Sequence, residues 1–162
     1  MKVVIFCGGV GSRLREETEF RPKPMIIVGN RPILWHIMKL YSHYGYNDFI
    51  LCLGYKGEMI KDYFLNYDEL NHDFTLRLGG GEKKIVHHDK KTPTWNITFV
   101  DTGLECETGS RLARVKKYLD GEENFFLTYG DGVADIDLQE LLSNHREKNK
   151  TGLSKNPEIR YE

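Results

Sequence analysis

Three glycines, an arginine and a proline-flanked lysine stand close together near the start of the chain, directly after the apolar run at residues 3–6. Glycines behind a strand let backbone N–H groups converge on an anion, because the missing side chains allow positive φ and close approach. Residues 8–12 hold the glycines, Arg13 follows them, and Lys23 stands between two prolines. Arg offers phosphate a planar fork of donors and Lys a point charge. The stretch therefore predicts a triphosphate-binding loop, with a turn carrying solvated charges as the alternative.

The glycine spacing does not match either of the common phosphate-binding motifs. It misses the dinucleotide-binding pattern G-x-G-x-x-G, and no Gly-Lys-Ser/Thr sequence completes a P-loop. Neither standard phosphate-binding motif therefore applies.

An aspartate between two glycines, Asp131 in Gly130-Asp131-Gly132, is the candidate metal ligand. It follows a predicted strand, and open α/β sheets bind ligands at the carboxyl ends of their strands. The alternative is a simple turn, which Asp and Gly both favour. The nearby Asp135 and Asp137 are interpreted as solvated or helix-starting acids, not as metal ligands.

A Gly-Ser turn at residues 107–111 opens a predicted helix. The free N–H groups of such a helix start suit a phosphate or the polar edge of a base. An ordinary N-cap by Thr108 or Ser110 is the alternative interpretation.

The elements that must position these residues alternate between strands and helices. Apolar and β-branched runs predict strands over residues 3–6, 48–55, 95–103 and 124–132. Helical spacing predicts helices over residues 31–45, 58–67 and 110–119. A further helix is predicted to begin near Asp137, where Asp137 and Glu140 form a capping box. Residues 71–94 predict a short β excursion. The alternation predicts an α/β fold with an open, mostly parallel sheet flanked by helices.

The composition indicates one soluble globular domain. With 162 residues, 40% apolar residues and a formal net charge of −1, the chain has no basic footprint for nucleic acid. No apolar run approaches a membrane span and no signal peptide is evident, so we expect a cytoplasmic protein that binds neither nucleic acid nor membrane. Three separated cysteines without a CxxC pattern indicate reduced thiols.

The string GGxGSRLxxxTxxxPKP at residues 8–24 resembles the signature of the sugar-1-phosphate nucleotidyltransferases. The resemblance continues over about the first 150 residues, in an order most like the glucose-1-phosphate cytidylyltransferases. The strings that carry it are RPILWHIMKLY, LGYKG, WNITFVDTG, TGSRLxR and TYGDGVAD. The resemblance implies a Rossmann-like fold of the glycosyltransferase A type. It also implies formation of CDP-glucose and diphosphate from CTP and α-glucose 1-phosphate with Mg²⁺, in a pathway that supplies bacterial surface polysaccharide.

The resemblance also assigns roles to single residues. Arg13, Lys23 and Asp131 are implied to be catalytic, with Arg13 at the leaving diphosphate, Lys23 at the reacting phosphates and Asp131 on Mg²⁺. The implied nucleotide contacts are Phe6, Cys7, Gly8, Gly9, Val10, Gly11, Ser12, Arg13, Lys23, Cys106, Arg111 and Gly130. A family Thr-Gly-Gly-Arg pattern is Thr-Gly-Ser-Arg here, which affects any contact made by the third backbone N–H.

The resemblance ends near Lys150, where residues 151–162 (TGLSKNPEIRYE) form an atypical tail after a nucleotide-binding domain at residues 1–150. Members of this family are longer, and their second metal Asp and most sugar-binding residues lie in a C-terminal portion missing here. We expect a truncated chain that associates with copies of itself. The open alternatives are a catalytically impaired nucleotide-binding remnant and a uridylyl or thymidylyl transferase of the same family.

Overall fold

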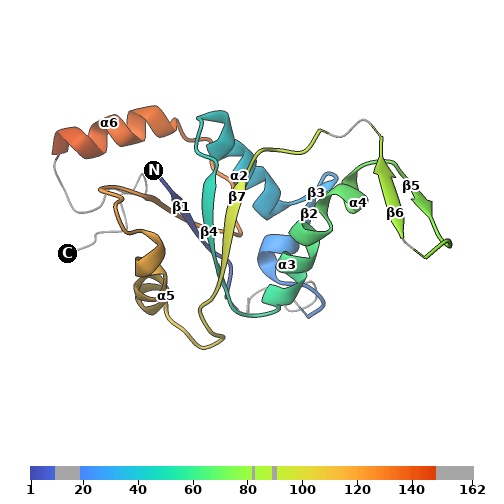
Figure 1. The fold of residues 1–162 in the computed structure, drawn as a ribbon. Coiled ribbons are helices and arrows are strands. Elements are labelled where there is room, and N and C mark those ends of the chain that lie inside the picture. Colours follow the sequence, from blue (N-terminus) through green and yellow to red (C-terminus); the bar gives the residue numbers. More distant parts are fainter. Residues whose placement is uncertain (10–18, 82, 89–90, 149–162) are drawn as a thin grey trace.

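A four-stranded parallel sheet forms the centre of the protein (Figure 1). The computed structural model describes residues 1–9, 19–81, 83–88 and 91–148. Its sheet has the order β7-β4-β1-β8. The strand bounds are Val3–Phe6 for β1, Asp48–Leu53 for β4, Asn96–Asp101 for β7 and Phe126–Tyr129 for β8. The chain therefore builds outward from β1 through β4 to β7 and then returns to place β8 on the other side of β1.

Alternate residues of the sheet pack into two separate cores. On β1, Val3 and Ile5 belong to one apolar cluster, whereas Val4 and Phe6 belong to the other. This division follows from the two-residue period of a strand, which sends successive side chains to opposite faces. Because both faces are covered, all four residues of β1 are buried, and its sequence is a continuous apolar run.

Helices cover the two faces of the sheet unequally. On one face, α2 (Ile33–His43), α3 (Gly57–Leu65) and α6 (Leu138–Lys148) contribute Met38, Ile60 and Leu138 to the larger core. On the opposite face, α5 (Thr108–Val115) contributes Val115 to the smaller core. Between them lies the sheet, so the described residues form a three-layer α/β arrangement (Figure 1).

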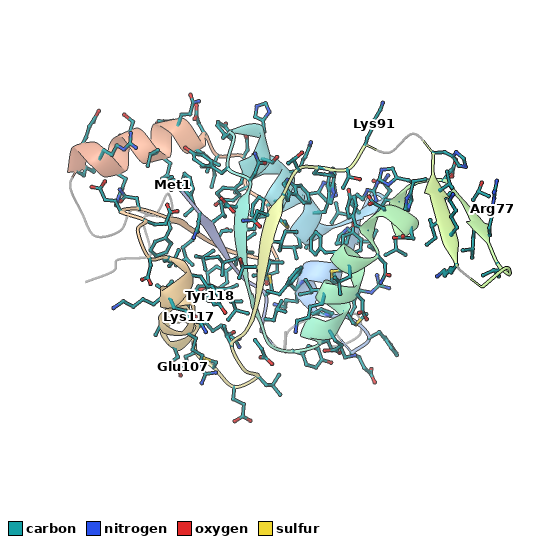
Figure 2. All side chains as sticks on the ribbon, in the orientation of Figure 1. Met1, Arg77, Lys91, Glu107, Lys117 and Tyr118 are labelled. Carbon is teal, nitrogen blue, oxygen red and sulfur yellow. The ribbon has the colours of Figure 1, made fainter. Side chains whose placement is uncertain are left out.

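Two small hairpins and three short helical segments complete the described elements. The short helical segments are η1 (Lys23–Met25), α4 (Tyr67–Asn71) and η2 (Lys116–Tyr118). The first hairpin pairs β2 (Ile27–Val28) with β3 (Arg31–Pro32), and the second pairs β5 (Phe74–Arg77) with β6 (Lys84–His87). The second hairpin, which carries Arg77, lies at the far end of the molecule from the sheet (Figure 2).

The predicted elements are present, with shifted ends. The predicted helix at residues 31–45 begins at Ile33, because Pro32 pairs with Ile27 in the first hairpin and is the N-cap instead of a residue of the first helical turn. The predicted helix at residues 110–119 is α5 followed by the 3-10 turn η2. The hairpin of β2 and β3 was not predicted, since two-residue strands carry too little periodicity to be detected.

Asp137 caps α6, as the capping box predicted. Its carboxylate accepts hydrogen bonds from the backbone N–H groups of Gln139 and Glu140 at 2.9 and 3.1 Å. Among the helices that the structure describes, none combines the length and apolarity needed to cross a bilayer.

Candidate active site

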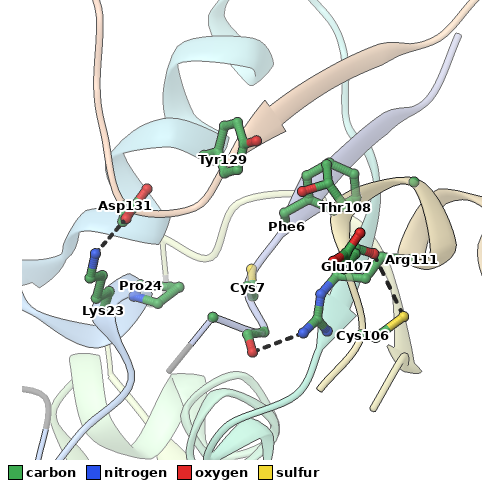
Figure 3. Close-up of a pocket in the computed structure, with 13 residues that line it drawn as sticks. Phe6, Cys7, Lys23, Pro24, Cys106, Glu107, Thr108, Arg111, Tyr129 and Asp131 are labelled. Atoms are coloured by element: carbon green, nitrogen blue, oxygen red, sulfur yellow. Dashed lines mark hydrogen bonds and ion pairs between the residues drawn. The ribbon is translucent and has the colours of Figure 1, made fainter. Parts of the chain in front are cut away.

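A pocket of about 450 Å³ opens at the carboxyl ends of β1 and β8 (Figure 3). These two strands are neighbours in the sheet but are far apart in chain order, so their crossover connections run to opposite sides. Open α/β sheets bind ligands at such a switch point, outside the carboxyl ends of the strands. The lining residues are Phe6, Cys7, Gly8, Gly9, Lys23, Pro24, Cys106, Glu107, Thr108, Gly109, Arg111, Tyr129 and Asp131.

Lys23 and Asp131 meet at one end of this pocket. The Lys23 ammonium lies 3.4 Å from Oδ2 of Asp131, and both side chains remain partly exposed. Pro22 and Pro24 are buried on either side of Lys23, and the Met25 N–H donates to the Pro22 carbonyl at 2.8 Å. The buried prolines therefore restrict the backbone on both sides of Lys23, while its amine lies at the pocket.

Arg111 lies at the other end and is buried, with only 5% of its surface exposed. Its guanidinium donates to the carbonyls of Gly8 and Leu104 at 3.1 and 3.2 Å. It also donates to the Thr102 hydroxyl at 2.6 Å and the Leu53 carbonyl at 3.2 Å. Hydrogen bonds from Arg111 thus connect Gly8, the first glycine after β1, to the ends of β4 and β7.

The predicted nucleotide contacts fall into three groups. Phe6, Cys7, Gly8, Gly9, Lys23, Cys106 and Arg111 line the pocket. Gly130 packs beneath it, because a Cβ at this position would lie 3.0 Å from the Cys7 sulfur and 3.1 Å from the Phe6 carbonyl. Val10, Gly11, Ser12 and Arg13 lie outside the described residues.

Burial keeps the two core thiols neutral. It raises the pKa of Cys7 well above 9.0, with smaller contributions from Cys52 and Asp131, and it raises the pKa of Cys52 to about 12. Neither thiol is therefore a nucleophile near neutral pH. The pocket is lined by the cations Lys23 and Arg111 and by Asp131, and charged groups of this kind suit positioning and charge neutralisation better than covalent catalysis.

The sequence pattern that defines the family described as Nucleotidyl transferase matches residues 2–157. The chain belongs to the nucleotidyl transferase family. The glucose-1-phosphate cytidylyltransferase of Salmonella typhimurium is 49% identical to it over 150 residues, which cover 93% of this chain and 58% of the relative. The probable glucose-1-phosphate cytidylyltransferase of Bacillus subtilis is also 49% identical, over 91% of this chain and 57% of its own length.

The predicted nucleotidyltransferase fold is confirmed by solved structures. A UDP-glucose pyrophosphorylase from Acinetobacter baumannii superposes with a TM-score of 0.65 at 17% identity, covering 91% of this chain and 53% of the other. At that identity the likeness shows the fold alone. The chain spans a little over half the length of the curated relatives it matches.

The donor set of this nucleotidyl transferase fits a hard divalent cation. Within the described ranges, no three His, Cys, Asp or Glu side chains gather closely enough to enclose a metal ion. Asp131 nevertheless presents a carboxylate at the pocket, and Mg²⁺ is commonly held by one or two carboxylates together with substrate phosphates and water. Asp131 is thus a suitable anchor for a cation that arrives with a nucleotide.

Some pocket residues of this nucleotidyl transferase were not among the predicted contacts. They are Pro24, Glu107, Thr108, Gly109 and Tyr129. Tyr129 packs edge-on against Phe6, with ring centroids 5.7 Å apart, at the end of β8. Its position at the end of a predicted strand, one residue before the Gly-Asp-Gly turn, was the signal that could have identified it, since ligand pockets of open α/β sheets lie at the carboxyl ends of the strands.

Proposed function

We propose that this chain is the nucleotide-binding part of a glucose-1-phosphate cytidylyltransferase, with residues 1–150 as its nucleotide-binding domain. The proposed reaction converts CTP and α-D-glucose 1-phosphate into CDP-glucose and diphosphate. The observation that carries the proposal is the high identity to two cytidylyltransferases along nearly the whole chain. The pocket supports it, because it brings Lys23 and Asp131 together where a triphosphate can bind.

The proposed reaction needs no covalent bond to the protein. A phosphate oxygen of glucose 1-phosphate forms a new bond to the α-phosphorus of CTP. The bond from that phosphorus to the oxygen bridging the β-phosphate breaks in line, and diphosphate leaves with the electron pair. Positioning and charge neutralisation supply the catalysis in phosphoryl-transfer reactions of this kind.

Each cation of the site has a separate task in this proposal. Lys23 neutralises charge on the reacting phosphates, and Arg13 contacts the leaving diphosphate. Asp131 would hold Mg²⁺, which supplies positive charge to the phosphate oxygens when bound. Cys106 and Arg111 lie at the opposite end of the pocket from the Lys23–Asp131 pair, which suits the nucleoside end of CTP (Figure 3).

The proposal extends to the setting of the reaction. It places the reaction in the cytoplasm, in a pathway for bacterial surface polysaccharide, and it includes association of the chain with copies of itself. Among the described strands β8 is at the edge of the sheet, and its Leu127 is 40% exposed, which supports association.

The test uses the 162-residue chain itself, with Mg²⁺, glucose 1-phosphate and each nucleoside triphosphate in turn. Nucleotide binding is measured by isothermal titration calorimetry, and diphosphate release is measured by a coupled enzyme assay. A Lys23→Met variant is compared with Lys39→Met, which removes an exposed lysine from α2. We expect CTP to bind most tightly and Lys23→Met alone to weaken binding.

Each result has a distinct meaning. CTP-dependent diphosphate release supports the full reaction, whereas CTP binding without release supports a nucleotide-binding remnant and contradicts catalysis by this chain alone. A preference for UTP or dTTP would overturn the assignment of the base. A folded chain that binds no nucleoside triphosphate would overturn the proposal.

A further inference from the structure

The turn between β4 and α3 lies directly against Gly8. This residue precedes residues 9–18 (the glycine segment), and Glu19 follows them. The Tyr55 N–H donates to the Gly8 carbonyl at 3.4 Å. A Cβ on Gly54 would lie 2.7 Å from the Gly8 carbonyl oxygen and 2.9 Å from that of Gly103, so the close approach requires glycine at this position. Residues 54–55 therefore fix the position of Gly8, which immediately follows Cys7.

Lys56, the next residue of this turn, contacts the other described flank of the glycine segment. Its ammonium donates a hydrogen bond to the backbone carbonyl of Glu19 and lies 5.3 Å above the Tyr55 ring. Gly8 and Glu19 are thus joined through three consecutive residues, although the segment between these flanks is ten residues long.

Lys56 has an unfavourable backbone conformation. Its φ is +49°, and among the described residues it is the one non-glycine residue with a positive φ. A glycine would adopt this left-handed conformation with less strain. Glycine could not reach Glu19, so the side-chain hydrogen bond gives a physical reason for a lysine at a position whose backbone favours glycine.

We propose that Lys56 is a positioning residue that sets the separation between the two flanks of the glycine segment, Gly8 and Glu19. The proposal rests on the proposed nucleotide-binding function, because the glycine segment is the part expected to contact phosphate. Lys56 is not among the described residues that line the pocket, and its ammonium is already engaged by a carbonyl. It therefore acts through the backbone and does not contact the nucleotide.

Three substitutions separate the hydrogen bond from the backbone strain. Lys56→Met removes the donor and keeps the strain, whereas Lys56→Gly removes the donor and relieves the strain. Lys56→Arg keeps a donor of similar reach. Lys39→Met on α2 is the matched control for loss of one surface lysine.

The first measurement is hydrogen exchange of the nucleotide-free chain, followed by mass spectrometry. We expect peptides covering residues 19–21 to exchange about 10-fold faster in Lys56→Met and Lys56→Gly, and at the wild-type rate in Lys56→Arg and Lys39→Met. This readout does not depend on which ligand the protein binds. Unchanged exchange in both Lys56→Met and Lys56→Gly would overturn the proposal.

The second measurement is the affinity for CTP with Mg²⁺, with thermal unfolding recorded on the same samples. We expect both Lys56→Met and Lys56→Gly to bind CTP about 10-fold more weakly, and Lys56→Arg to restore binding. Lys56→Gly should do so without a lower melting temperature, since it relieves strain. If wild-type protein binds CTP and these variants bind it equally well, Lys56 is only a local structural contact and the proposal is wrong. If wild-type protein binds no CTP, the proposed function fails. Hydrogen exchange still tests whether the hydrogen bond from Lys56 holds Glu19 in position.

Discussion

The Lys23 ammonium lies 3.4 Å from the Asp131 carboxylate, joining residues 108 positions apart in the chain. One comes from the short helix η1 and the other follows the edge strand β8. In the absence of nucleotide, the carboxylate that is proposed to hold Mg²⁺ therefore already has a cationic neighbour. Lys23 and the proposed metal ion would therefore compete for the same Asp131 oxygen.

This competition predicts opposite effects of one substitution on two ligands. Lys23→Met should raise the affinity of the nucleotide-free chain for Mn²⁺, by up to about 5-fold, since partly exposed ion pairs contribute at most about 1 kcal/mol. The same substitution should lower the affinity for CTP, because a phosphate contact is lost. Electron paramagnetic resonance of free Mn²⁺ and calorimetry of CTP binding measure the two effects. A decrease in Mn²⁺ affinity would contradict the competition, and Asp131→Asn, which should abolish tight Mn²⁺ binding, is the reference variant.

A methyl group at Gly8 should lower the stability of the fold, whereas a methyl group at Gly9 should leave the stability nearly unchanged. The Cβ of Gly8→Ala would lie 2.1 Å from Nη1 of Arg111, whose guanidinium is buried and held by several acceptors. We expect a loss of about 1–3 kcal/mol in the free energy of unfolding. At Gly9 a Cβ meets no atom of the described residues within 4 Å, so Gly9→Ala should change stability by less than about 0.5 kcal/mol. Urea denaturation compares the two variants, and equal stabilities would show that Arg111 moves aside at no cost.

Loss of the Arg111 guanidinium should destabilise the whole fold, since four protein acceptors each lose one hydrogen-bond donor. Two of these acceptor residues, Leu53 and Thr102, are buried. We expect Arg111→Met to lower the free energy of unfolding by about 2–4 kcal/mol. Arg77→Met, on the exposed hairpin, is the control and should cost less than about 0.5 kcal/mol. Chemical denaturation measures both, and a small effect at Arg111 would show that water replaces its donors.

The raised thiol pKa of Cys52 predicts lower stability at high pH. In the unfolded chain the thiol ionises near pH 9.0, but in the folded protein its pKa is about 12. The stabilisation is complete below pH 9 and decreases as the pH rises towards 12, because only the unfolded state then releases the proton. We expect the free energy of unfolding to fall by about 1–2 kcal/mol from this thiol between pH 8 and pH 10.5.

The matched variant for this prediction is Cys52→Val, which removes the titrating group from the core. Burial also raises the pKa of Cys7, Tyr41 and Tyr63, and these three groups remain in both proteins. Urea denaturation at several pH values should therefore show a smaller decrease for Cys52→Val than for the wild type. Parallel curves would mean that Cys52 ionises equally in the folded and unfolded chains.

Local patterns in the sequence were sufficient to predict the elements and their class. Periods of two and of about 3.6 residues distinguish strands from helices, and the four central strands and four longer helices lie where those periods predicted them. Local context also made Lys23 a candidate phosphate contact and Asp131 a candidate metal ligand, with a simple turn as the alternative for Asp131, and both residues line the pocket. Arg111 was predicted as a nucleotide contact. Its burial and its hydrogen bonds to protein groups could not be read from the helix that carries it, because they depend on the strands packed beneath that helix.

The order of the strands was decided by the tertiary structure. A period identifies a strand but does not say which other strand lies beside it, since pairing depends on how the crossover helices pack on the two faces. That packing puts β8 beside β1, and so brings Asp131 to Lys23. It also puts the Gly54–Lys56 turn between Gly8 and Glu19. The amino-acid sequence by itself determined which types of residue could do the chemistry. Their assembly into one pocket was decided by the tertiary structure, because burial of both faces of a single sheet fixes which strands lie side by side.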